Sequence, residues 1–68
     1  MSYRETIKEF SGSIIGYLDH EDNGDITVRA FSGKMLGRYE KSGDVTKDFY
    51  GKILYRGNMA SALLILFR

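Results

Sequence analysis

The sequence predicts a small, mostly β domain: an antiparallel meander of about six short strands, built as three hairpin repeats and followed by an apolar C-terminal segment. A turn motif recurs along the chain, there are eight glycines and no proline, and nine of the 68 residues are Tyr or Phe. Many glycines together with many aromatic and β-branched residues favour short strands joined by tight turns. A chain of this length forms one domain, 1–68.

The repeat is clearest between "GDITVRAFSGKMLGR" (24–38) and "GDVTKDFYGKILYR" (43–56), which share eight residues in the same order once one position is skipped. A weaker copy is "IKEFSGSIIGYL" (7–18). Each copy has a phenylalanine followed two positions later by glycine, and glycine supplies the positive φ that a tight hairpin turn needs. The predicted turns are Ser11-Gly12, Ser32-Gly33 and Tyr50-Gly51.

The runs that flank these turns have strand length and are rich in β-branched or aromatic residues. They predict strands at 5–10, 13–18, 25–31, 34–40, 45–49 and 52–56, which pair as hairpins over about 5–18, 25–40 and 45–56. Aliphatic residues occupy both alternating positions after each turn, so we expect a sheet that is curled into a barrel-like core or covered on its second face. We interpret Gly16 and Gly37, which lie within strands, as bulges or points of close backbone approach.

The apolar segment 58–68 is expected to cover the sheet. Asn58 is a good helix cap and the residues after it favour a helix, with a strand as the alternative for 65–67. From Met59 to Phe67 only Ser61 is polar, and a helix that is apolar all round must be buried all round. One small sheet cannot enclose it, so we expect a homo-oligomer, the alternative being a tail in the mouth of a curled sheet. The predicted interface residues are Met59, Leu63, Leu64, Leu66 and Phe67.

The stretch "FSGKMLGRY" (31–39) is similar to the repeat unit of the four-fold beta-flower proteins and, more loosely, to the tyrosine–aspartate repeats of bacterial toxin shells. The matching residues are Phe31, Gly33, Lys34, Leu36, Gly37 and Tyr39, with Phe49, Gly51, Lys52 and Leu54 in the next copy. The resemblance covers 7–56 and implies an all-β array of short hairpins. Because the motif specifies a hairpin rather than a chemistry, it implies no activity and no site residue.

The stretch "DHEDNGDI" (19–26) is spaced like the first half of a calcium loop. Counted from Asp19, the EF-hand ligand positions fall on Asp19, Glu21, Asn23 and Asp25. The twelfth position is Ala30, where an EF-hand has a bidentate Glu, and both flanks look like strands. The corresponding stretch "EKSGDV" retains only Gly-Asp-aliphatic, which favours a turn. Weak calcium binding at 19–27 is therefore an alternative, and no cofactor is expected.

A basic stripe is a second candidate site. Four cations occupy equivalent places in successive repeats, and cations interleaved with aromatics on a sheet suit a single-stranded nucleic acid or another polyanion. They are Lys34, Arg38, Lys52 and Arg56. The net charge of +1 gives no bulk attraction to polyanions, and Glu40 or Asp48 would neutralise the stripe. Polyanion binding is therefore the alternative and not the leading expectation.

Catalysis is not expected. The chain has no cysteine, and its single histidine, His20, has no nucleophile or oxyanion glycine beside it, although Asp19 or Asp22 would be in reach to pair with it. Most tyrosines are expected to pack across strands, with a groove for a peptide or sugar as the alternative. They are Tyr3, Tyr17, Tyr39, Tyr50 and Tyr55.

The leading expectation is a non-catalytic structural or protein-interaction module that associates with itself and, as a further option, with another protein. The N-terminal "MSYRETIKEF" is charged and lacks the apolar core of a signal peptide. The apolar tail is shorter than the roughly 20 residues of a membrane-spanning helix. A soluble, cytoplasmic protein without membrane contact is the default expectation.

Overall fold

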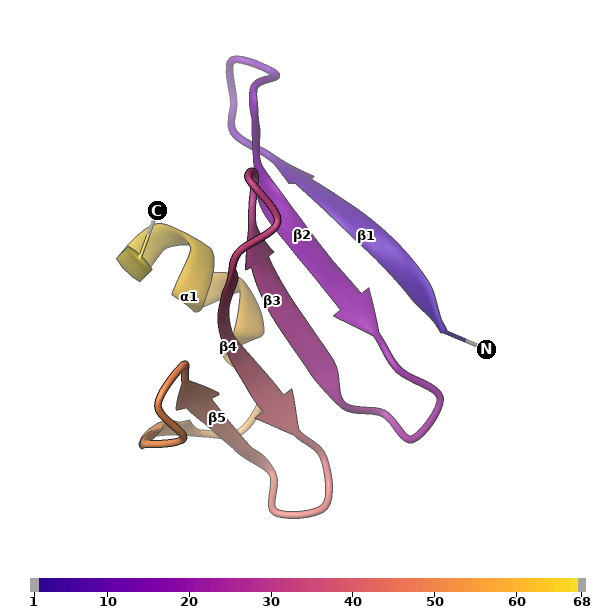
Figure 1. The fold of residues 1–68 in the computed structure, drawn as a ribbon, viewed down its shortest axis with the longest axis vertical. Coiled ribbons are helices and arrows are strands. Elements are labelled where there is room, and N and C mark those ends of the chain that lie inside the picture. The colour runs from indigo at the N-terminus through magenta and orange to yellow at the C-terminus, as the bar shows by residue number, and fades with distance from the viewer. Residues whose placement is uncertain (1, 68) are drawn as a thin grey trace.

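A computed structural model describes residues 2–67, apart from the side chain of Phe67. It confirms a mostly β fold with a six-stranded antiparallel sheet and a C-terminal helix (Figure 1). The elements are β1 (Tyr3–Lys8), β2 (Ile14–His20), β3 (Ile26–Ala30), β4 (Met35–Glu40), β5 (Val45–Asp48), β6 (Ile53–Arg56) and α1 (Ala60–Phe67). Each strand pairs with its neighbours in the chain, so the sheet is a simple meander. Residues 1 and 68, the ends of the predicted domain, lie outside the described residues.

Four turns share one geometry, a three-residue loop that ends in glycine. In each, the glycine N–H donates to the carbonyl oxygen three residues earlier, for example Gly33 to Ala30 at 2.9 Å. The four glycines have φ between 85° and 94°, a region that a Cβ disfavours. They are Gly12, Gly24, Gly33 and Gly51. The loops are one residue longer than the predicted two-residue turns, so the phenylalanine before Ser or Tyr is the first loop residue and not the end of a strand.

The β4–β5 turn is the exception, because aspartate takes the place of glycine. Asp44 has φ 52° and its N–H donates to the carbonyl oxygen of Lys41 at 3.1 Å. Aspartate tolerates this left-handed conformation better than most residues. Gly24 therefore corresponds to Asp44 in the structure, and the equivalence of Gly24-Asp25 with Gly43-Asp44 is wrong by one position.

Each of the three hairpins formed by β1–β2, β3–β4 and β5–β6 has a bulge at the same place. The strand pairing skips Ile15, Leu36 and Leu54, the second aliphatic after each turn. A bulge changes the direction of the side chain that it carries, and all three side chains belong to the core or pack against it. One face of the sheet therefore holds the apolar core, to which the bulges turn the second aliphatic after each turn. The first aliphatics, Ile14, Met35 and Ile53, pair with Lys8, Arg29 and Lys47 on the opposite face, so aliphatic residues occupy both faces beside the turns.

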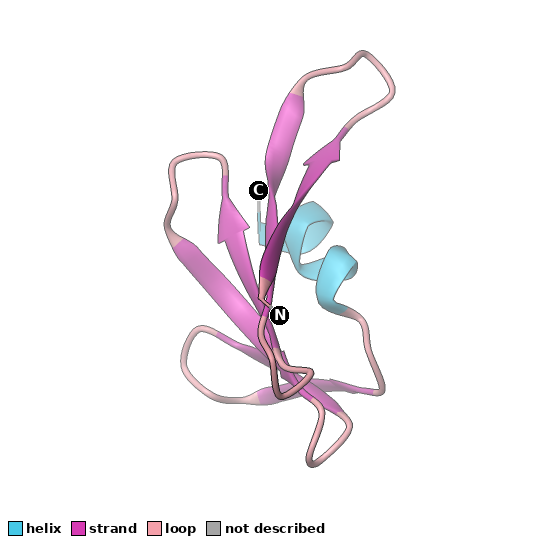
Figure 2. Cartoon of the chain, turned by 90° about the vertical axis from the view of Figure 1, so that its right-hand side faces the viewer, coloured by secondary structure: helices cyan, strands magenta, loops and turns pink. Residues whose placement is uncertain are grey.

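Helix α1 covers the apolar face, where it packs over β2, β3 and β4 (Figure 2). Leu63 and Leu64 are fully buried there. A Cβ on Gly37 would lie 2.8 Å from Leu63 Cδ1, and a Cβ on Gly16 would overlap Leu64 Cδ2. The two glycines therefore allow the helix to approach the sheet. Each also directly follows a bulged residue, so the interpretation of Gly16 and Gly37 is confirmed.

The helix itself is confirmed over 60–67, which removes the strand alternative for 65–67. Asn58 caps it, since the Asn58 Oδ1 accepts a hydrogen bond from the Ala60 N–H at 3.2 Å. Thr46 joins the segment before the helix to β5: its buried hydroxyl donates to the Gly57 carbonyl and accepts from the Met59 N–H. The helix is not buried all round, because Ile65 and Leu66 face outward and are more than half exposed.

Candidate functional site at the aromatic end of the sheet

The turns at the two ends of the sheet differ in their first loop residue. The β1–β2, β3–β4 and β5–β6 turns lie at one end of the meander and begin with Phe10, Phe31 and Phe49. The β2–β3 and β4–β5 turns lie at the other end and begin with Asp22 and Ser42. Since the same loop forms with aspartate, its geometry does not require an aromatic residue. We call Phe10, Phe31, Phe49 and the adjacent Tyr50 the aromatic end.

The side chains of the aromatic end are exposed. The exposed fractions are 109% for Phe10, 64% for Phe31, 52% for Phe49 and 89% for Tyr50. The twist of the sheet spreads the three turns apart, and the β1–β2 turn projects beyond the rest of the molecule at the top of Figure 1. The other two turns border a hollow of about 240 Å³.

Apolar, aromatic and charged residues together line the hollow. Its lining residues are Lys34, Met35, Leu36, Asp48, Phe49 and Tyr50. The rings of Phe49 and Tyr50 meet edge to face, with centroids 5.4 Å apart. The Asp48 Oδ1 accepts hydrogen bonds from the N–H groups of Tyr50 and Lys52, both at 2.9 Å, and so holds the turn that carries these rings. Lys34 forms no ion pair within the described residues.

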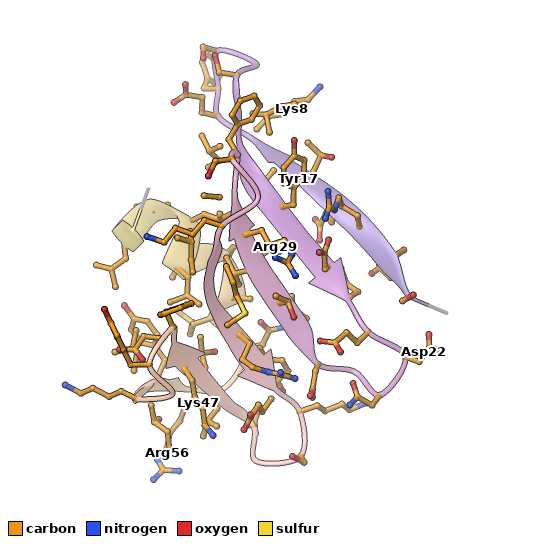
Figure 3. All side chains as sticks on the ribbon, in the orientation of Figure 1. Lys8, Tyr17, Asp22, Arg29, Lys47 and Arg56 are labelled. Carbon is orange, nitrogen blue, oxygen red and sulfur yellow. The ribbon has the colours of Figure 1, made fainter. Side chains whose placement is uncertain are left out.

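The face of the sheet opposite α1 is charged and open. Asp19 joins Arg4 and Arg29, at 2.7 Å and 3.0 Å from their Nε atoms. The Arg4 guanidinium also lies 4.7 Å from the centre of the Tyr17 ring. Figure 3 labels Tyr17 and Arg29, which the strand register places opposite each other on this face. The ordinary pattern of an antiparallel sheet, one face in the core and one in water, therefore holds here.

A second cluster on this face surrounds Arg38. Its Nη2 lies 2.7 Å from Asp25 and 3.7 Å from Glu21, and its Nε lies 3.8 Å from Glu40. Glu40 also pairs with Lys47 at 2.8 Å. Cations and anions alternate across the strands, so this face carries no block of one sign.

The predicted calcium ligands do not converge. Asp19 is held by arginines, Glu21 accepts from the Thr27 hydroxyl at 3.0 Å, and Asn23 Oδ1 accepts from the Asp25 N–H at 3.0 Å. Asp25 accepts from Arg38 and from the Lys41 N–H. Within residues 2–67, no three His, Cys, Asp or Glu residues gather where they would hold a metal ion.

We expect the fold to lose stability in acid as Asp19 and Asp25 protonate. Hydrogen bonds from Arg4 and then Arg29 lower the pKa of Asp19, and the Lys41 N–H followed by Arg38 lowers the pKa of Asp25. Because the folded pKa lies below the unfolded value of about 3.9, the stabilisation is present above that pH and is lost as pH falls through the folded pKa. Urea unfolding midpoints measured from neutral pH down to pH 2 check this. An Asp19→Asn/Asp25→Asn variant whose midpoint falls as steeply in acid would contradict it.

The four cations of the predicted basic stripe do not form one continuous stripe. Lys34 and Lys52 flank the turns of the aromatic end, whereas Arg38 is neutralised in its cluster of carboxylates. The strand register places Arg38 opposite Lys47 and Arg56 opposite Val45. Glu40, one of the two expected neutralising residues, does pair with Arg38 and Lys47.

The predicted interface residues separate into two groups. Leu63 and Leu64 lie in the core of their own chain, whereas Met59 and Leu66 are exposed, and the side chain of Phe67 lies outside the described part. An interface formed by this helix would therefore use its outward side chains, including Ile65, which sequence reasoning missed. It also missed the aromatic end, although the contrast between the first loop residues at the two ends is visible in the sequence once the turns are located.

His20 pairs with Glu5 and not with Asp19 or Asp22. Its Nε2 lies 2.9 Å from Glu5 Oε1, and its ring stacks on Tyr3 with centroids 4.3 Å apart. Of the tyrosines, Tyr39 is buried in the core and donates its hydroxyl to Asp44 Oδ1 at 2.7 Å. Tyr50 alone among the five lines the hollow described above.

No protein-family model, curated protein or solved structure matches this chain. The resemblance to beta-flower and tyrosine–aspartate repeats therefore stays a prediction. The described part of the chain contains no helix of the length and hydrophobicity that crossing a membrane requires.

Proposed function

We propose that this chain is a non-catalytic protein-interaction module that associates with copies of itself through the aromatic end. The observation that carries the proposal is the contrast between the two ends of the sheet. Turns of one geometry carry Phe10, Phe31 and Phe49 at one end and polar residues at the other. Burying a phenylalanine side chain is worth about 1.5–3 kcal/mol, and this gain is largely unrealised in the single chain.

The outward side of α1 provides a second exposed apolar group. Ile65 is 69% and Leu66 54% exposed, and Met59 precedes the helix with 42% of its surface exposed. Exposed apolar side chains that gather on a small domain mark sites where another protein binds. Aromatic residues in particular are enriched in the buried centre of interfaces.

The size of the domain supports self-association as well. A chain of about 60 residues buries only about 60% of the surface that its unfolded form exposes, so its own core gives it little stability. The usual supplements are disulfides, a structural metal or association, and the chain has no cysteine. Contacts between copies would add the apolar burial that one copy lacks.

A non-catalytic role fits the arrangement of the titratable groups. His20 is engaged by Glu5 and stacked on Tyr3, and the carboxylates of the open face are held by arginines. Catalytic groups are typically collected in a concave site beside a nucleophile or a metal. The hollow instead contains aromatic and aliphatic side chains, which suit binding.

Light scattering coupled to size-exclusion chromatography, from micromolar to millimolar concentration, tests the proposal. We expect the mass to rise with concentration, and we expect a Phe10→Ser/Phe31→Ser/Phe49→Ser variant to remain monomeric. Serine is compatible with the turn because Ser42 takes this position in the β4–β5 loop. The matched control is Asp22→Ser at the opposite end, which should associate like the parent chain. A parent chain that is monomeric throughout would refute the proposal.

Polyanion binding is the second candidate, carried by Lys34, which forms no ion pair in the described chain, and by Lys52, which follows the neighbouring β5–β6 turn. The pairing of Arg38 with carboxylates makes it the weaker candidate. Anisotropy of a labelled single-stranded oligonucleotide at low salt separates the two: binding that weakens steeply with added salt would favour the polyanion role.

A further inference from the structure

We propose that the Phe10 ring of one copy inserts into the hollow between the β3–β4 and β5–β6 turns of a second copy. This inference rests on the proposed self-association and names the contact that produces it. Each copy carries both the exposed aromatic side chain and the aromatic-lined hollow, at two separate places on its surface. The contact joins the side chain of one copy to the hollow of another.

Phe10 is the inserting group because none of the described residues covers it. Its exposed fraction is 109%, whereas Phe31 and Phe49, at the same loop position, are partly covered. The β1–β2 hairpin carries Phe10 at its tip, which projects from the body in both views (Figures 1 and 2). Asp22 at the equivalent position of the β2–β3 turn shows that the loop itself does not need a phenylalanine.

The hollow matches a phenyl ring in size and in chemistry. Its volume of about 240 Å³ exceeds the roughly 150 Å³ of an apolar protein cavity that is known to bind benzene. Phe49 and Tyr50 supply ring faces and edges against which a third ring packs edge to face. Met35 adds a flexible side chain whose sulfur makes favourable contacts with aromatic rings.

Charge also favours a second copy as the occupant. Lys34 borders the hollow and forms no ion pair within its own described chain. Glu9 immediately precedes Phe10, so an inserted hairpin tip brings a carboxylate toward this ammonium group. In this fold Phe10 does not occupy the hollow of its own chain, because it is fully exposed and is not among the lining residues.

The inserting residue and the hollow are different surfaces, so a single contact of this kind is heterologous and repeats head to tail. Two copies that exchange hairpin tips instead make the contact twice across a two-fold axis and close an isologous dimer. A complementation experiment detects the contact in either arrangement. One variant lacks the Phe10 ring but keeps the hollow, and the other lacks the hollow but keeps Phe10. Mixing the two variants therefore restores one contact.

The tip variant is Phe10→Asp, and the hollow variant is Phe49→Ser/Tyr50→Ser. Each substitution introduces a residue type that another turn of this chain has at the same loop position, Asp22 for the tip and Ser42 and Ser11 for the hollow, so both are expected to fold. A well-dispersed amide spectrum and the parent's circular dichroism confirm folding. Light scattering should find each variant monomeric at concentrations where the parent chain associates.

Amide chemical shifts provide the decisive measurement. When unlabelled hollow variant is added to ¹⁵N-labelled tip variant, we expect saturable shifts at 34–36 and 48–51. Adding a variant with all three substitutions should produce none, because it lacks the Phe10 ring. Phe31→Asp is the matched control, since it removes a phenylalanine from the same loop position outside the hollow, and it should associate like the parent.

Three results overturn the inference: a Phe10→Asp variant that associates like the parent, loss of association in Phe31→Asp instead, or a mixture of the two variants without shifts in the hollow. The first two leave the proposed function intact, because the chain still associates with itself. A parent chain that never associates overturns the proposed function. The mixture of tip variant and hollow variant tests only whether Phe10 enters the hollow.

Discussion

Replacing Leu64 by alanine is expected to lower the free energy of unfolding by about 2–5 kcal/mol, because the substitution leaves a cavity at a fully buried position. Leu64 packs over Gly16 and Leu63 over Gly37, and both leucines belong to the core cluster between the helix and the sheet. A domain of this size has a total stability of only about 3–10 kcal/mol, at about 0.05–0.15 kcal/mol per residue. The variant would therefore be partly or largely unfolded at room temperature.

Urea denaturation at low micromolar concentration, where association is least, measures the effect of Leu64→Ala. Ile65→Ala is the matched control, because it shortens the next side chain of the same helix at an exposed position. We expect Ile65→Ala to change stability by about 0.5 kcal/mol or less. If instead Leu64→Ala changed only the oligomeric state and left the unfolding of the monomer unaltered, Leu64 would belong to a subunit interface, as the sequence suggested.

Replacing Gly37 by alanine is expected to destabilise the domain by about 1–3 kcal/mol or more, because the site is already filled. The new Cβ would overlap the Lys47 carbonyl oxygen, lie 2.8 Å from Leu63 Cδ1 and lie 3.2 Å from the Asp48 Cα. Two of these neighbours are backbone atoms of β5, so relief requires the strand pairing itself to move. The helix would be displaced from the sheet at the same time.

Gly43→Ala is the control for Gly37→Ala, since it is the same substitution in the turn that joins β4 to β5. Gly43 does not have a positive φ, and the nearest atom to its new Cβ would be Val45 Cγ2 at an ordinary 3.6 Å. Such a replacement stabilises by about 0.4–1 kcal/mol by restricting the unfolded chain. Opposite signs for the two variants in thermal unfolding are the expected result. A neutral Gly37→Ala would mean that the helix does not pack as closely as the structure shows.

The sequence predicted the elements of this fold well and their faces less well. Strands, turn positions and the Asn58 cap depend on neighbouring residues, so a local reading finds them. The burial of Leu36 depends on a bulge that shifts the pairing of β4 with β3 by one residue, and simple alternation assigns such a side chain to the wrong face. The same limit misaligned Gly43 with Gly24, because identical letters occupy different positions in the two loops.

The candidate site was predicted only in fragments, because its residues come from separate turns. Lys34 was noted as a cation and Tyr50 as an aromatic that would suit a groove, but nothing in their spacing shows that they border the same hollow. Conversely, the carboxylates of Asp19, Glu21 and Asp25 look like part of a metal loop in sequence, and in space they pair with arginines of other strands. Contacts between residues of different strands and turns determine both the lining of the hollow and the partners of these carboxylates.

The sequence by itself determined that this chain forms a meander of short hairpins that ends in a capped helix. Backbone conformation at glycine, strand alternation and helix capping are local properties, and each was visible within a few residues. Only the tertiary structure decided that Leu63 and Leu64 face inward while Ile65 faces out, and that Phe10 is left fully exposed. These outcomes depend on which sheet face the helix covers and on how far the sheet twists, and both arise from packing between residues far apart in the chain.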